Sequence, residues 1–401
     1  MNRLKILFLL FLSIGFGMAQ GQGDSSRLRI SLLTCTPGAE LYSVFGHSAL
    51  RIVDSASGTD IVYNYGTFNF SDPNFYTKFV RGKLLYFLSQ SSFEDFMAEY
   101  RYFKRGVIEQ VLQLNAAEKV ELQQFMFQNV REENRYYSYD FLFDNCTTRL
   151  RDLIFKNKNL QRVAIDPFVA SETTFRDHLH AYLDKAQMNW TALGIDLLVG
   201  MQADGKMDVY ESMFLPEFLA KGLGKAQKMG GPLLSEEQII LEDGQEVSTR
   251  TPLWKLPLFL ILCFSFFWIA MGFAKDRLTA YQKSVDRFVF MLTGMLGILL
   301  LFMWFGTDHQ NCSKNINLIW AIPFNVIIPF VLKSSNKWVF TYLKVYSLLL
   351  LLLLLVTILH SGWLNMALYP FIVAISYRSW MLAQAGKDLL KKMPSVNTST
   401  T

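Results

Sequence analysis

Residues 47–68, HSALRIVDSASGTDIVYNYGTF, carry the pattern that sets the fold class of the N-terminal half of the chain. Two runs rich in β-branched and aromatic residues, HSALRIVD and DIVYNYGTF, flank the small polar segment SASGT. Runs of this kind on either side of a Ser/Gly turn predict a β-hairpin. The preceding run RLRISLLTC, at 27–35, has the same alternating character and predicts another strand.

Beyond residue 90 the apolar residues recur at helical spacing instead. Asn115 stands before AAEKVELQQFMFQNVREEN, and Glu118 follows it three positions later, which is typical of a helix N-terminus. The segments FRDHLHAYLDKA (175–186) and YESMFLPEFLAKGL (210–223) are also predicted to be helical, and residues 222–232 are expected to form a tether. Strands followed by helices indicate an α+β domain.

The composition of the whole chain is too apolar for an ordinary soluble protein. Hydrophobic residues make up 51% of the 401 residues and charged residues only 18%, whereas soluble domains have about 25% charged residues. So much apolar surface excludes intrinsic disorder, and the mild net charge of +5 gives no indication of nucleic-acid binding.

The apolar excess is concentrated beyond residue 252 in five runs, four of which approach the ~20 residues that span a bilayer. The third run is shorter and is interrupted by Pro323 and Pro329. The predicted transmembrane helices are Leu253–Ala274, Phe288–Gly306, Leu318–Leu332, Trp338–Leu359 and Trp363–Ala383.

The N-terminus reads as a secretory signal peptide. A basic start, MNRLK, precedes the apolar run ILFLLFLSIGFGMA and a polar stretch, and cleavage is expected near Ala19. An uncleaved anchoring helix is the alternative. Export through this leader places the segment up to residue 252 outside the cytoplasm.

The distribution of Lys and Arg agrees with that orientation. The loop after the first predicted span carries Lys275, Arg277, Lys283 and Arg287, and the loop after the second carries only Lys314. Because basic residues are enriched in cytoplasmic loops, the first loop is predicted inside and the second outside. With five spans the C-terminus is then cytoplasmic.

Three cysteines are predicted to face outward, and two readings are open for them. Cys35 and Cys146 can pair as a disulfide, as exported thiols often do. Alternatively, Cys146 follows Asp144 and Asn145, either of which is a good N-cap, so it stands in the first turn of a predicted helix. There the helix dipole favours a nucleophilic thiolate.

A nucleophilic thiolate needs a base, and the exported segment offers three histidines. His178 and His180 fall on an amphipathic helix, where a solvated face is the expected explanation. His47 follows a glycine at the start of a predicted strand, and a strand-borne His facing a Cys at a helix N-terminus is the papain-type arrangement. The alternative explanation for His47 is a buried, hydrogen-bonded histidine without a catalytic role.

A third polar group is needed to orient the His47 imidazole. Asn64, in the paired strand, is the first candidate, with Asp54 and Asp60 behind it.

Four longer motifs carry a family resemblance. The order of a His on a strand and then a Cys on a helix resembles the circularly permuted papain-like group, which includes NlpC-like hydrolases and lecithin–retinol acyltransferase. More closely, the chain resembles the periplasmic domain of Lnb-type bacterial lipoprotein N-acyltransferases. The motifs are LLTCTPGAELYSVFGHSALRI (32–52), VYNYGTFNF (62–70), PNFYTKFVRGKLLY (73–86) and YDFLFDNCTTRLRD (139–152).

The resemblance implies a membrane enzyme that moves an acyl chain onto the N-terminal amine of diacylglyceryl lipoproteins. Cys146 is then the nucleophile and His47 the base, with membrane phospholipid as a second partner and no cofactor or metal. The implied location is the bacterial inner membrane with the catalytic domain in the periplasm. Residues expected to contact substrate are Tyr42, Asn145, Arg149 and His309. For His309, in the polar loop after the second span, the alternative is that the loop only caps helices and is solvated.

The predicted domains follow from these features. They are a signal peptide (1–19), a periplasmic Cys/His catalytic domain (20–190), a helical extension and tether (191–252), a five-helix transmembrane domain (253–383) and a cytoplasmic tail (384–401). Two other functions stay open: a membrane-tethered NlpC-like amidase or peptidase acting on peptidoglycan, and a non-enzymatic sensor of lipids or peptides.

Overall fold

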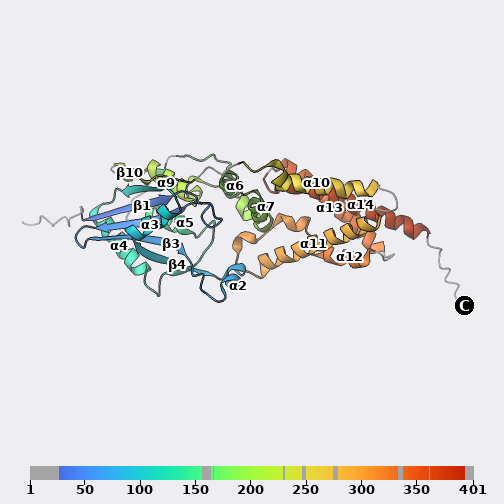
Figure 1. Ribbon diagram of the computed structural model, residues 1–401, viewed down its shortest axis with the longest axis horizontal. Coiled ribbons are helices and arrows are strands. Elements are labelled where there is room, and N and C mark those ends of the chain that lie inside the picture. The colour runs from blue at the N-terminus through green and yellow to red at the C-terminus, as the bar shows by residue number, and fades with distance from the viewer. Residues whose placement is uncertain are drawn as a thin grey trace, which may run out of the picture.

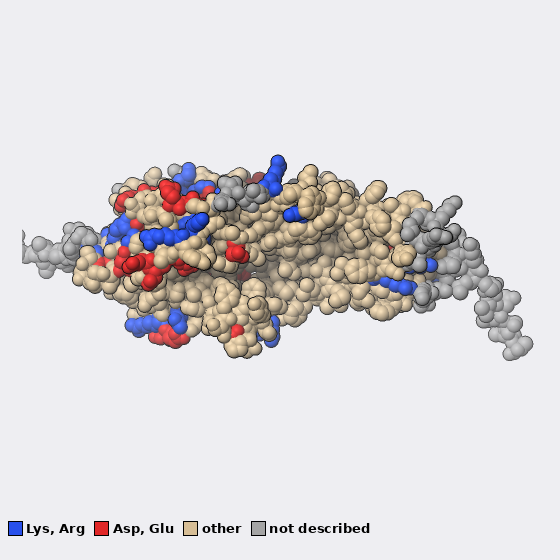
Figure 2. Space-filling view, in the orientation of Figure 1, with Lys and Arg blue, Asp and Glu red and all other residues tan. Residues whose placement is uncertain are grey.

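The computed structural model describes residues 27–155, 164–165, 167–228, 231–245, 250–273, 279–332, 337–360 and 362–392. The predicted leader with its cleavage site near Ala19, and the loop positions Lys275 and Arg277, lie outside the described residues. The molecule is elongated, with a β-sheet domain at one end and a bundle of apolar helices at the other (Figure 1). Charged side chains gather over the sheet domain, whereas the surface of the helical end shows few of them (Figure 2).

The N-terminal region is an α+β domain built on a seven-stranded sheet of order β10-β5-β1-β2-β3-β4-β6. All neighbouring strands in it are antiparallel. The strands are β1 (Leu28–Cys35), β2 (His47–Asp54), β3 (Thr59–Thr67), β4 (Leu85–Ser92), β5 (Val107–Leu112), β6 (Tyr136–Ser138) and β10 (Leu234–Leu241). A small second sheet contains β7 (Ala164–Ile165), β8 (Ala226–Lys228) and β9 (Gly231–Pro232).

The predicted hairpin is confirmed. Strands β2 and β3 pair antiparallel, with Leu50 opposite Tyr63. On the other side of β2, strand β1 pairs so that Cys35 lies opposite His47.

Helices cover both faces of the sheet. One face packs against α4 (Ala116–Asn129), α5 (Cys146–Phe155) and α9 (Pro216–Lys225), and the other against α3 (Phe93–Tyr102). The predicted capping box of α4 is present, because Asn115 Oδ1 accepts from Glu118 N at 2.9 Å and Glu118 Oε2 accepts from Asn115 N at 2.7 Å.

Two predictions in the segment 191–252 are wrong. The segment expected as a tether is folded, since the chain runs through β8 and β9 and then returns to the main sheet as β10, which pairs with β5. This edge strand is mostly exposed, and its polar sequence SEEQ gives no apolar alternation. The predicted helix 210–223 is also interrupted, because α8 (Val209–Ser212) ends before α9 starts at Pro216. The sheet therefore extends past the boundary predicted at 190.

The C-terminal region is helical, and its described residues contain three helices long and apolar enough to cross a membrane. These are Tyr281–Phe305 in α11 (Thr279–Phe305), Lys337–Leu359 in α13, and Met366–Gly386, most of which is α14 (Tyr369–Lys392). A fourth crossing forms if Gln310–Ile319 and Pro323–Val331, bent by 58°, count as one span. The first predicted span is a shorter apolar helix, Pro257–Phe273, which contains α10 (Pro257–Ala270).

The bent pair packs closely against α11 because small residues face it. A Cβ placed on Gly297 would lie 2.0 Å from the Ala321 carbonyl oxygen, and one on Gly294 would lie 2.2 Å from Val326 N. Small residues at such contacts let backbones approach inside membranes.

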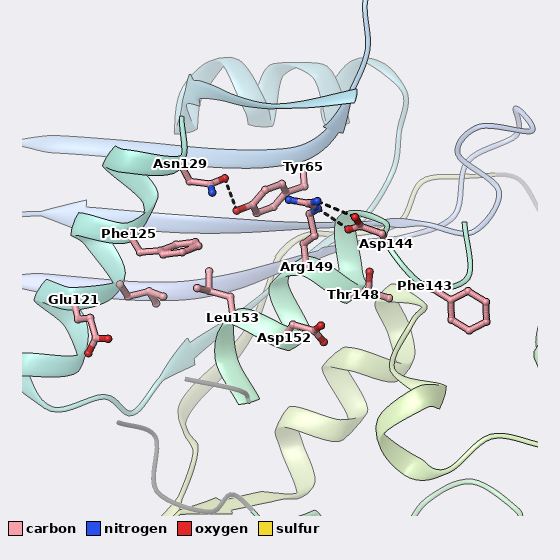
Figure 3. A pocket seen from close by; sticks show the side chains of 11 residues that line it. Tyr65, Glu121, Phe125, Asn129, Phe143, Asp144, Thr148, Arg149, Asp152 and Leu153 are labelled. Carbon is pink, nitrogen blue, oxygen red and sulfur yellow. Dashed lines mark hydrogen bonds and ion pairs between the residues drawn. The ribbon is translucent and has the colours of Figure 1, made fainter. Parts of the chain in front are cut away.

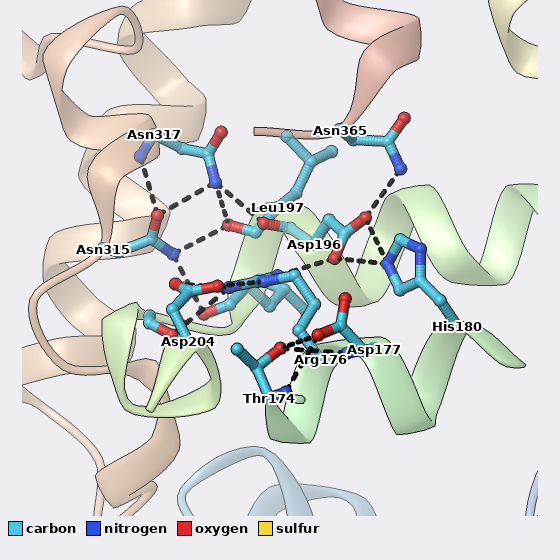
Figure 4. A network of polar contacts seen from close by, with 12 residues as sticks. Thr174, Arg176, Asp177, His180, Asp196, Leu197, Asp204, Asn315, Asn317 and Asn365 are labelled. Carbon is cyan, nitrogen blue, oxygen red and sulfur yellow. Dashed lines mark hydrogen bonds and ion pairs between the residues drawn. The ribbon is translucent and has the colours of Figure 1, made fainter. Parts of the chain in front are cut away.

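Two further helices, α6 (Phe175–Lys185) and α7 (Asn189–Leu198), connect the sheet domain to the helical end through a buried polar network (Figure 4). Arg176 binds Asp196 and Asp204, each at 2.6 Å. From the helical end, Asn317 Nδ2 donates to the Asp196 carbonyl oxygen at 2.8 Å, and Asn365 Nδ2 donates to Asp196 Oδ2 at 2.6 Å. This network ties the two regions together at α7.

Candidate active site

Helix α5 begins at Cys146 because Asn145 caps it. Asn145 Oδ1 accepts from the backbone N–H groups of Thr147 at 2.7 Å and Thr148 at 2.9 Å. The amide nitrogen of Asn145 donates to the carbonyl oxygens of Phe141 at 2.7 Å and Phe214 at 3.0 Å. The predicted substrate contact at Asn145 is thus a buried cap whose amide is occupied by protein groups, and it fixes the position of the cysteine.

His47 enters β2 directly after a glycine with a left-handed backbone. Gly46 has φ +83°, and a Cβ at this position would lie 2.8 Å from the Cys35 carbonyl oxygen. Only glycine combines this conformation with so close an approach. The resulting sharp entry sets the imidazole at the end of the strand.

The structure brings Cys146, His47 and Asn64 together. The His47 side chain hydrogen-bonds to the Cys146 sulfur, and His47 Nε2 lies 3.2 Å from Asn64 Oδ1. Because Asn64 occupies Nε2, Nδ1 is the ring nitrogen left for the cysteine. Gly66, next to Cys146, has φ +89°, a backbone conformation that favours glycine.

The cysteine and histidine shift each other's titration toward an ion pair. Burial raises the pKa of Cys146, but the charge and hydrogen bond of His47 outweigh burial and lower this pKa to about 7. Burial lowers the pKa of His47, but the neighbouring Cys146 thiolate and Asn64 raise it above its usual value. A thiolate beside an imidazolium is the reactive state of a cysteine nucleophile.

Two neighbouring residues that were not predicted from the sequence also form hydrogen bonds with the Cys146 sulfur. The backbone N–H of Ser48 hydrogen-bonds to Cys146, and Ser48 Oγ lies 3.1 Å from Thr147 Oγ1. The sequence signal that could have identified them is their position, since Ser48 directly follows His47 and Thr147 directly follows Cys146.

Cys35 is a buried free thiol next to the site. All four cysteines of the chain fall within the described residues, and each is free. Burial raises the pKa of Cys35 to about 12 despite a hydrogen bond to Tyr100. Cys35 is therefore protonated at neutral pH, in contrast to Cys146.

The alternative orienting carboxylates do not face His47. Asp60 forms two hydrogen bonds with Arg51, at 2.8 and 2.6 Å. Asp54 lies at the opposite end of β2 and accepts from Ala56 N at 3.0 Å in the hairpin turn. Asn64 is thus the candidate that the strand register places beside the imidazole.

Arg149 lies one turn after Cys146 and lines a cavity of about 670 Å³ between α4 and α5. Its Nε and Nη2 donate to Asp144 at 2.6 and 2.8 Å, and its guanidinium lies 3.6 Å from the centre of the Tyr137 ring. Figure 3 shows the Arg149–Asp144 pair at one end of this cavity and Phe125 on its α4 side. Neither Cys146 nor His47 is among the described residues that line this cavity, so a substrate contact at Arg149 stays a prediction.

The other two predicted substrate residues lie apart from the Cys–His pair. Tyr42, 67% exposed in the loop before β2, has no hydrogen-bond partner within the described ranges. His309 Nε2 bonds to the Phe79 carbonyl oxygen at 2.9 Å, so it connects the helical end to the loop that contains α2 (Phe75–Val80).

One contact links the helical end to the turn before Cys146. Asn311 Nδ2 donates to Asp140 Oδ1 at 2.9 Å, and the same oxygen accepts from the N–H groups of Leu142 and Phe143. Nothing in the sequence pattern signals this contact, because it joins positions 171 residues apart.

The expectation of a solvated face for His178 and His180 is wrong. His178 is buried against Phe218, with ring centres 4.0 Å apart, and burial lowers its pKa to about 4. His180 Nε2 bonds to Asp196, which raises its pKa. The exposed face of α6 lies instead at Asp177, Ala181 and Asp184, whereas His178 packs against α9 and His180 binds α7. Within the described ranges, no group of three or more His, Cys, Asp or Glu side chains is arranged to hold a metal ion.

Comparison with known protein families gives two matches that together cover most of the chain. Residues 17–180 match the Lnb N-terminal periplasmic domain, and residues 245–387 match the Lnb transmembrane domain. The first match contains His47, Asn64 and Cys146, and the second contains the loop with His309 and Asn311. No curated protein and no solved structure matches the chain.

Proposed function

The chain belongs to the Lnb family, with a periplasmic domain followed by a transmembrane domain, and on this premise we propose that it is a lipoprotein N-acyltransferase. The observation that carries the proposal is the Cys146–His47–Asn64 cluster, in which the pKa of the thiol is lowered to about 7 inside the periplasmic domain. The proposed acceptor is the N-terminal amine of a diacylglyceryl lipoprotein.

The first half-reaction loads the cysteine. The Cys146 thiolate attacks the carbonyl carbon of a glyceryl ester, a C–S bond forms, and the ester C–O bond breaks. The His47 imidazolium gives its proton to the departing alkoxide, which leaves as an alcohol.

The second half-reaction releases the acyl chain. The lipoprotein amine attacks the thioester, a C–N bond forms, and the C–S bond breaks to restore the thiolate. His47 accepts the proton lost by the amine, so the enzyme returns to its ion-paired state. Asn64 holds the imidazole through Nε2 in both steps.

The negative charge on the tetrahedral intermediates needs hydrogen-bond donors. The N–H of Cys146 belongs to the first turn of α5, where N–H groups have no acceptor within the helix. Such a donor contributes about 3 kcal/mol to transition-state stabilisation in comparable enzymes.

The arrangement of elements supports a permuted papain-like catalytic domain. The His lies at the start of a strand, the Cys at the N-terminus of a helix, and the Asn on the neighbouring strand, which reproduces the Cys-His-Asn roles of papain-like enzymes in a different chain order.

The connection to the apolar helices favours a lipid substrate over a soluble one. The turn before Cys146 contacts the helical end through the Asn311–Asp140 hydrogen bond. We place the protein in the bacterial inner membrane with five spans, α10 and the bent pair included, and with its C-terminus in the cytoplasm. A thioester near the bilayer is also shielded from water.

The test is to trap the acyl-enzyme. The full-length protein in vesicles containing a diacylated lipoprotein is expected to carry an acyl group on Cys146 that neutral hydroxylamine removes. Cys263→Ala, at an exposed position of an apolar helix, is the matched control and is expected to acylate normally. Release of stem peptides from peptidoglycan without a fatty acyl group on Cys146 would indicate the amidase, and full function in Cys146→Ala would indicate the sensor.

A further inference from the structure

The loop around α2 exposes an unusual group of large apolar side chains. Phe70 is 68% exposed, Tyr76 80% and Phe79 49%, and Val80 and Leu85 are also exposed. A contiguous exposed apolar patch of this kind marks a surface that contacts a protein or a membrane.

The position of this loop relative to the apolar helices favours contact with a membrane over contact with a protein. The membrane-spanning part of α11 ends at Phe305, and Asp308 N donates to the Arg81 carbonyl oxygen at 2.9 Å only three residues later. Gly82, with φ +68°, packs so closely that a Cβ there would lie 3.0 Å from the Asp308 carbonyl carbon. Figure 1 shows α2 beside the end of α11. The loop is thus fixed at the level where a spanning helix leaves the bilayer.

The charges in the loop suit the headgroup region. Arg81 and Lys83 are exposed among the aromatic residues, and Lys78 is part-buried and bound to Asp72 at 2.5 Å. Basic side chains beside aromatic rings are the composition of segments that lie at a membrane interface.

A chain of ring contacts leads from this loop to the nucleophile. Ring centres lie 4.6 Å apart for Phe70 and Phe68, 5.3 Å for Phe68 and Tyr86, and 4.3 Å for Tyr86 and Tyr139. Tyr139 Cε2 lies 3.9 Å from the position that a Cβ on Gly66 would take, and that position is 3.5 Å from Cys146 Cβ. The ring contacts of this aromatic strip therefore run from the exposed Phe70 to Tyr139, and Tyr139 and Cys146 both border Gly66.

We propose that the α2 loop, residues 67–86, is a second membrane-contact element that lies in the periplasmic leaflet beside α11, and that its aromatic strip receives the acyl chain that reacts at Cys146. The occupant is the hydrocarbon chain of a bilayer lipid or lipoprotein. The contact with the leaflet stands independently, whereas the role of the strip rests on the proposed acyl transfer.

Photocrosslinking of the full-length protein in phospholipid nanodiscs tests the membrane contact without requiring turnover. With p-benzoylphenylalanine in place of Tyr76, irradiation is expected to add the mass of a phospholipid to the peptide that contains residue 76. Tyr102, at the end of α3 on the other face of the sheet, is 81% exposed and is the matched control position. No lipid adduct at 76, or equal yields at 76 and 102, would overturn the proposal.

A pair of substitutions tests the acyl path. The variant Phe70→Ser/Tyr76→Ser is compared in two assays: turnover of lipoprotein in vesicles, and the burst of p-nitrophenol from soluble p-nitrophenyl butyrate. The lipoprotein rate is expected to fall by a factor about ten times larger than the burst does. The control Tyr102→Ser/Phe103→Ser is expected to change neither rate. An equal fall in both assays would overturn the acyl path. Absence of any burst in the wild-type protein would instead contradict the proposed function, and the crosslinking result would be unaffected.

Discussion

Two buried clusters of charge lie in the periplasmic region, and they are used differently. In the network around Asp196, every charged group has strong partners: Arg176 binds two carboxylates, and Asp196 also accepts from His180 and Asn365. In the cluster at Cys146, the thiolate depends on His47 and on weak donors such as Thr147 Oγ1, 3.7 Å away. The charged groups of the first cluster are fully paired, whereas the second cluster leaves the Cys146 sulfur able to react.

Each cluster contains a histidine whose pKa is raised, yet only one of them is suited to proton transfer. His180 gains its shift mainly from a hydrogen bond to Asp196, a carboxylate already bound to Arg176. His47 gains its shift against the cost of burial, from a thiolate whose own pKa is about 7. A raised histidine pKa therefore marks a catalytic group only when its partner can itself exchange a proton near neutral pH.

The largest expected effect separates the two histidines by activity. His47→Ala is expected to slow acyl-enzyme formation by about a thousandfold, because the thiolate loses both its counter-ion and its proton donor. His180→Ala is expected to retain the rate per folded molecule. Mass spectrometry of Cys146 during a single turnover measures both, and equal losses in the two variants would contradict the comparison.

The second prediction concerns the contribution of the Asp196 network to the stability of the protein. Asp196→Ala is expected to lower the free energy of unfolding by about 3–5 kcal/mol, because it leaves buried Arg176 with fewer partners. Glu172→Gln, which removes an exposed ion pair with Lys206, is the control and is expected to change stability by less than about 1 kcal/mol. Thermal unfolding of the purified protein in detergent checks this. A smaller effect for Asp196→Ala than for Glu172→Gln would show that the network does not hold α7.

A smaller effect tests the orienting residue. Asn64→Ala is expected to reduce the acylation rate by about tenfold to a hundredfold, since His47 keeps its charge but loses the bond that aligns it. Asp60→Asn, on the same strand but paired with Arg51, is the control and is expected to keep the rate near that of the wild type. If the two variants behave alike, Asn64 does not orient the imidazole.

The smallest change is a shift in pH dependence. Because the pKa of Cys146 is lowered to about 7, its thiolate fraction and its alkylation by iodoacetamide should fall as the pH drops through 7. In His47→Ala burial alone acts on the thiol, so the midpoint should move upward, beyond the ordinary thiol value. Peptide mass spectrometry of residue 146 across pH gives both midpoints. An unchanged midpoint in His47→Ala would disprove the ion pair.

Local sequence signals were sufficient for the hairpin and for the elements that carry the three proposed catalytic residues. His47, Asn64 and Cys146 each stand in a recognisable element, two adjacent strands and a capped helix, and the register of the strands brings the first two together. The capping role of Asn145 was predicted as well, but the donation of its amide nitrogen to the Phe214 carbonyl oxygen, 69 residues away, has no local signal.

The features that sequence reasoning missed depend on long-range packing. Strand β10 has exposed polar side chains and is defined by its pairing with β5. His178 and His180 lie on a helix that looks half-solvated in sequence, but α9 buries one and the Asp196 network binds the other. Neither neighbour is encoded in the periodicity of the helix itself.

The most direct measurement of the central claim is the mass of a lipoprotein N-terminus produced in cells with each cysteine variant. Cys146→Ala is expected to leave the amine unacylated, whereas Cys312→Ala and Cys263→Ala, away from His47, are expected to give the N-acylated mass. Immunoblotting in the same membranes confirms that each variant is present. An N-acylated lipoprotein made with Cys146→Ala as the sole copy of the enzyme would contradict the assignment of Cys146 as the nucleophile.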